Sequence, residues 1–214
     1  MKYRTYTHRL SISELVRVFG KKPQFVPLAI VLKLLKSRLL ESETDIDEAR
    51  YSTQEADLLH GETDGLKEAL NLLRRQSFEV VGFDYQEDNG SIFTSSLLYS
   101  TSKKCIALLI HSRNESVQID ELVTGFFSRT KDGSYVVTGN PNGYLPTPPT
   151  VARQVLKSKD LGTILESHME RIGRENLSWT NLTHEDVVAE HQAFVRENNS
   201  YLESRGVYER VNRG

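Results

Sequence analysis

The chain has 214 residues, of which 38% are hydrophobic and 26% are charged, as expected of a globular protein with one buried core. Its 27 basic and 29 acidic residues give a formal net charge of −2, which excludes a general electrostatic attraction to nucleic acid or anionic lipid. The single cysteine, Cys105, excludes an intramolecular disulfide and a site built from several thiolates.

The N-terminal stretch MKYRTYTHRL contains no apolar run of the kind that signal peptides carry. Together with the lone cysteine, this predicts a cytoplasmic protein. A capping box follows, Ser11-Ile-Ser-Glu14, in which each side chain accepts a hydrogen bond from the backbone of the other residue. A short amphipathic helix is predicted from residue 12 to Gly20, with these residues on its apolar face: Ile12, Leu15, Val16 and Phe19.

Residues 21–40 form the most apolar segment of the chain. Its uninterrupted apolar run, residues 25–32, is too short to span a membrane, which takes roughly 20 apolar residues. Three interpretations stay open: a helix buried in the core, an interface between copies of the chain, and an amphipathic helix on a protein or membrane surface. The candidate interaction residues here are Phe25, Leu28, Leu32 and Leu35. On a membrane, the basic residues would face the headgroups: Lys21, Lys22, Lys33, Lys36 and Arg38.

The acidic run at residues 41–48 has the composition of a solvated linker. We therefore predict an N-terminal helical segment with an acidic linker over residues 1–50, and a single α+β domain over residues 51–214. That domain begins with a helix, because a second capping box, Ser52 to Glu55, precedes an apolar stripe made of Leu66, Ala69, Leu70 and Leu73.

Residues 78–140 have the pattern of β-structure. Five strand-like stretches are separated by short polar breaks, including Asp88-Asn89-Gly90 and Lys131-Asp132-Gly133, which favour tight hairpin turns. Short connections join only antiparallel neighbours, so an antiparallel meander of about five strands is predicted.

A proline-rich stretch, residues 141–150, follows the last predicted strand. Its prolines disfavour both helix and ladder pairing, so we expect an extended crossover from the sheet to a helical layer. It is also a candidate docking strip for another protein, through Tyr144, Leu145 and Pro148.

Two helices close the chain. One carries an apolar stripe of Leu161, Ile164, Leu165, His168 and Ile172. The other begins at a Thr183–Asp186 capping pair, carries Val187, His191 and Leu202, and ends near Gly206. The predicted fold is α+β: N-terminal helices, an antiparallel meander of about five strands, and a C-terminal helical pair packed on the sheet.

The sequence carries none of the familiar phosphate-binding, zinc-protease or nucleophile-elbow motifs. Cys105 and His111 do not make a nucleophile and base, because six residues of one strand separate them by roughly 20 Å. Phe126, Phe127 and Tyr135, beside Arg129 and Lys131, could stack bases, but nearby acidic residues dilute the charge, and core packing with an ordinary hairpin tip explains them better. No nucleic-acid partner is expected.

Three histidines interrupt the C-terminal stripes: His168, His184 and His191. If the two helices pack face to face, these imidazoles converge on a metal site or act as a general base. Otherwise each histidine fills a packing gap and bonds a nearby backbone group. We predict no metal and no cofactor.

These observations favour a non-enzymatic cytoplasmic adaptor that works through protein contacts, with a protein partner or a second copy of itself. A metal-dependent or histidine-based enzyme, with its site between the C-terminal helices, is one alternative. A peripheral membrane protein that binds through the helix at residues 24–40 is the other. The sequence identifies no substrate, small-molecule ligand or biological process.

Overall fold

We describe a computed structural model of the chain. The structure describes residues 2–18, 26–34, 41–45, 51, 64–88, 91–114, 116, 118–141, 145–175, 177–178 and 182–211. The chain forms two compact units. The first unit comprises Met1–Glu48, Asn142–Pro148 and Gln192–Gly214, and the second comprises Ala49–Pro141 and Pro149–His191. Neither unit is one continuous stretch of chain, and the division predicted at residue 50 stays a prediction.

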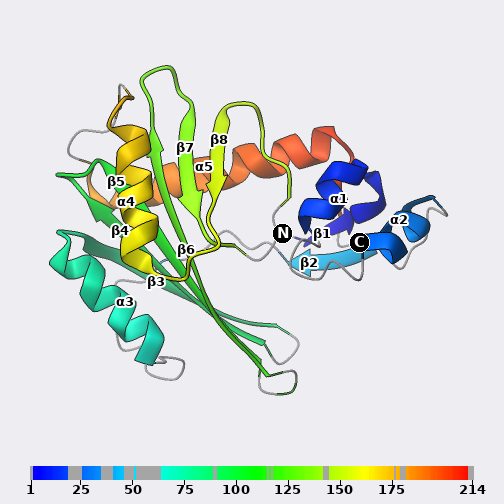
Figure 1. The fold of residues 1–214 in the computed structure, drawn as a ribbon, viewed down its shortest axis with the longest axis horizontal. Coiled ribbons are helices and arrows are strands. Elements are labelled where there is room, and N and C mark those ends of the chain that lie inside the picture. Colours follow the sequence, from blue (N-terminus) through cyan, green and yellow to red (C-terminus); the bar gives the residue numbers. More distant parts are fainter. Residues whose placement is uncertain are drawn as a thin grey trace. The chain divides into compact units, whose positions relative to one another are not determined.

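The second unit is built on a six-stranded sheet with the strand order β3-β4-β5-β6-β7-β8 (Figure 1). Its strands are β3 (Glu79–Asp88), β4 (Ser91–Ser100), β5 (Cys105–Asn114), β6 (Ile119–Arg129), β7 (Tyr135–Gly139) and β8 (Val151–Val155). The first five are antiparallel neighbours in chain order. The prediction of an α+β fold with a mostly antiparallel sheet is confirmed.

Strand β8 is a correction to the predicted crossover. The proline-rich stretch does not lead directly to the helices, because it connects β7 to β8, which pairs with β7 in parallel. Strand β8 has only five residues, VARQV, and most of them are not fully buried, so the sequence does not show the alternating pattern of a strand. Pairing with β7, rather than local preference, makes it a strand.

The two faces of this sheet carry different helices. Because side chains alternate along a strand, neighbouring residues of β6 face opposite sides. Phe126 belongs to the core beneath α3 (Asp64–Arg75) and α4 (Leu161–Ile172), and we call this side the α3–α4 face. Phe127 contacts His191 of α5 (His184–Ser204), and we call this side the α5 face. Figure 1 shows α4 lying over the near side of the sheet.

The core of the α3–α4 face confirms the apolar stripes predicted for both helices. The four predicted residues of α3 are buried, and so are the five predicted residues of α4, His168 included. Their partners in this core are Phe78, which directly precedes β3, and these residues of the sheet: Phe83, Leu98, Cys105, Ala107, Leu109 and Phe126.

The first unit contains a second, three-stranded sheet with the order β2-β1-β9. Its strands are β1 (Lys2–Tyr6), β2 (Glu41–Asp45) and β9 (Tyr208–Arg210). The prediction that residues 41–48 form a linker is therefore wrong for Glu41–Asp45, and the C-terminal tail also contains a strand. In the register, Lys2 lies opposite Asp45 and Arg4 opposite Glu43.

The helices of the first unit are η1 (Thr7–Arg9), α1 (Ile12–Val18) and α2 (Val26–Leu34), together with the second half of α5. Its buried core consists of Leu10, Leu15, Leu202 and Val207, so residues from both ends of the chain form it together. Leu145, from the connection between β7 and β8, packs against this core. Among the described helices, none is both long enough and apolar enough to cross a bilayer.

Candidate functional site

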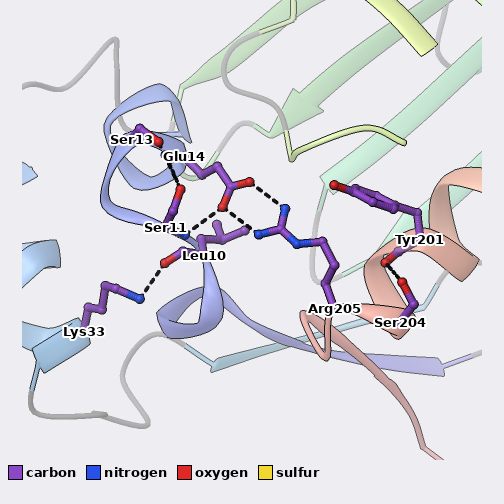
Figure 2. A network of polar contacts seen from close by, with 8 residues as sticks. All are labelled: Leu10, Ser11, Ser13, Glu14, Lys33, Tyr201, Ser204 and Arg205. Carbon is purple, nitrogen blue, oxygen red and sulfur yellow. Dashed lines mark hydrogen bonds and ion pairs between the residues drawn. The ribbon is translucent and has the colours of Figure 1, made fainter. Parts of the chain in front are cut away.

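In the first unit, an ion pair joins the N-terminal and C-terminal parts of the chain. Arg205 donates from Nη1 to Glu14 Oε1 at 2.5 Å and from Nη2 to Glu14 Oε2 at 3.0 Å, as Figure 2 shows. The Arg205 guanidinium also lies over the Tyr201 ring, 5.6 Å from its centroid. A two-pronged bond of this kind fixes both distance and orientation. It therefore ties the first turn of α1 to the end of α5.

Glu14 has a second role in the predicted capping box. The Ser11 backbone N–H donates to Glu14 Oε2 at 2.7 Å, and the Glu14 backbone N–H donates to Ser11 Oγ at 3.3 Å. The hydrogen bonds from Arg205 and then from Ser11 hold the pKa of Glu14 at about 2, against the opposing effect of burial. The carboxylate is therefore charged at neutral pH. The capping box is confirmed, and its partner Arg205 had no signal in the local sequence.

Two further contacts hold the helices of this unit in place. Lys33 of α2 donates from Nζ to the Leu10 carbonyl at 2.5 Å, just before α1 (Figure 2). Arg9 donates from Nη1 to the Gly206 carbonyl at 2.8 Å, just after α5. We call this set of contacts, made by Glu14, Arg205, Lys33 and Arg9, the clasp.

The helices held by the clasp expose large aliphatic side chains. Ile12 and Val16 of α1 are 49% and 44% exposed, and Val31 of α2 is 50% exposed. Ile12 and Val16 are four residues apart on one helix, so they lie on the same side of it. We call these three exposed side chains, on the neighbouring helices α1 and α2, the candidate interaction surface.

The structure describes only some of the interaction residues predicted from sequence. Phe25, Leu35 and Tyr144 lie outside the described residues. Leu28 and Leu32 belong to α2. Leu145 packs against the core of the first unit, and Pro148 is buried. Their roles in binding stay predictions. Ile12 and Val16 were expected on a buried face, and their exposure is visible only in the structure.

His168 sits in a closed hydrogen-bond network on the α3–α4 face. Its Nε2 lies 3.1 Å from Ser128 Oγ, and its Nδ1 lies 3.2 Å from Thr138 Oγ1. Ser128 Oγ donates to the Lys104 carbonyl at 2.9 Å, so it accepts from His168 Nε2–H. Arg171 Nη1 donates to Thr138 Oγ1 at 2.9 Å, so Thr138 donates to His168 Nδ1.

This network leaves Ser128 and His168 no catalytic role as a nucleophile and base. The imidazole already carries its proton on the nitrogen that faces Ser128, and both side chains are fully buried. Burial, and then the charge of Arg171, lowers the pKa of His168 to about 3, which keeps the imidazole neutral. The network is a satisfied buried polar cluster that links α4 to β6 and β7.

His191 lies on the other face of the sheet. Its Nδ1 is 3.2 Å from the Tyr51 hydroxyl, and its ring is 5.9 Å from the Phe127 ring. Burial lowers the pKa of His191 to about 4. Next to it, Glu190 accepts hydrogen bonds from Arg129 Nη1 at 3.0 Å and from the Tyr135 hydroxyl at 3.2 Å. These contacts fasten the first half of α5 to the sheet.

The structure does not bring the three predicted histidines together. His168 is on the α3–α4 face, His191 is on the α5 face, and His184 is exposed at the first residue of α5. Over the described part of the chain, no three His, Cys, Asp or Glu side chains cluster as metal ligands. The convergence on which the enzyme and metal hypotheses depended is absent for these residues.

Cys105 and His111 lie on β5 as expected, and each has a separate environment. Cys105 is fully buried, and burial raises the pKa of its thiol. His111 is buried, with Nε2 at 2.7 Å from Oδ1 of the largely exposed Asp120. Phe126, Phe127 and Tyr135 are buried, so these three rings are part of the core.

Comparison of the chain with protein-family models, with curated proteins and with solved structures finds no match.

Proposed function

We propose that the chain is a cytoplasmic protein-binding module without catalytic chemistry of its own, and that it binds through α1 and α2. One observation carries this proposal: Ile12, Val16 and Val31 are about half exposed on two neighbouring helices. Exposure of large aliphatic side chains to water is unfavourable. A partner that covers them lowers the free energy of the complex.

The clasp supports the same proposal, because it fixes the surface before a partner arrives. Lys33 and the Glu14–Arg205 pair hold α2 and α1 on the core of the first unit. A surface that is already ordered loses little conformational entropy on binding, so the same apolar contact gives a higher affinity. A second copy of the chain, or another protein with an apolar face, fits this chemistry.

The test replaces Ile12 and Val16 together by Asp in the full chain. Sedimentation velocity over a range of concentrations measures self-association, and affinity capture from a cell extract, read by mass spectrometry, identifies other partners. The proposal predicts that the wild-type chain associates and that the double variant loses the association. Asn71→Asp adds a charge on the exposed side of α3 and serves as the control. It should keep every partner.

Three outcomes would refute this assignment. The first is a wild-type chain that is monomeric and captures nothing. The second is a double variant that keeps all its partners. The third is a double variant that unfolds as a whole, which circular dichroism would detect and which would show that α1 belongs to the core. Flotation with neutral and anionic vesicles separates a membrane surface from a protein partner, since only the former carries the chain to the top of the gradient.

A further inference from the structure

We draw no further inference here: the strongest candidate, the side-chain cluster in which the fully buried hydroxyls of Thr94 and Ser96 on β4 lie beside the buried His111 of β5 on the α3–α4 face, carries nothing, because protein atoms enclose both hydroxyl oxygens and a ligand has no access to them.

Discussion

Arg205 and Glu14 are 191 positions apart in the chain, yet their side chains share two hydrogen bonds of 2.5 and 3.0 Å. The same carboxylate accepts a hydrogen bond from the Ser11 backbone, so one side chain both caps α1 and anchors the end of α5. This arrangement makes the fold of the first unit depend on both ends of the chain at once. It also gives the unit a titratable group whose charge state matters for stability.

The first prediction concerns the energy of this pair. Glu14→Gln keeps a capping side chain but removes the charge that Arg205 binds, so we expect a loss of about 1–2 kcal/mol in the free energy of unfolding. Urea denaturation, followed by circular dichroism, measures it. Arg205→Met and the double variant complete a double-mutant cycle. Additive effects of the two substitutions would show that the pair contributes no coupling.

The second prediction concerns pH and the same residue. The pKa of Glu14 is lower in the folded protein, about 2, than its ordinary value of 4.5. Its contribution is therefore complete above pH 4.5 and is lost as the pH falls towards 2. The difference in unfolding free energy between the wild type and Glu14→Gln should shrink across this window. A difference that stays constant from pH 5 down to pH 2 would contradict the role given to the carboxylate.

The third prediction concerns the buried histidines. Burial lowers the pKa of His168 to about 3 and of His191 to about 4, whereas both titrate near 6.5 in an unfolded chain. The unfolded state therefore takes up protons first, and stability is lost as the pH falls below 6.5. Each histidine contributes a slope of at most about 1.4 kcal/mol per pH unit.

Replacing His191 by Phe should lower this slope between pH 6.5 and pH 4 by up to about 1.4 kcal/mol per pH unit, because it removes one group whose pKa differs between the folded and unfolded states. Chemical denaturation at several pH values gives the slope directly. An unchanged slope would mean that His191 is protonated equally easily in both states.

The fourth prediction compares two glycines that face each other in the sheet. Gly139→Ala places a Cβ 2.6 Å from the Thr124 carbonyl oxygen, which is backbone and cannot move aside cheaply, so we expect a loss of about 1–3 kcal/mol. Gly125→Ala meets no atom within 4 Å and should change stability by less than about 1 kcal/mol, in the stabilising direction. Thermal unfolding of the two variants side by side provides the comparison. Equal losses would show that the two positions are equally crowded.

The elements predicted correctly are those whose pattern is local. The capping box at Ser11 and Glu14 fixes the start of α1 within four residues of chain. Alternation and turn residues locate β3 to β7, and the stripe of α4 includes His168 because one helical face is buried throughout its length. The histidine hypothesis was built on these stripes, but a stripe does not tell which face of the sheet its helix covers. Phe126 and Phe127 show that His168 and His191 pack on opposite faces.

By itself, the sequence determined that the chain is α+β with a mostly antiparallel sheet, because hydrophobic periodicity and capping act between residues that are close along the chain. The strands β1, β2, β8 and β9 were decided by tertiary structure alone. Each is only three to five residues long, so it becomes a strand only when a partner strand supplies its hydrogen bonds. Both β2 and β9 pair with β1, which lies far from each of them along the chain. The same reason hides the Glu14–Arg205 pair, since only folding brings these two residues together.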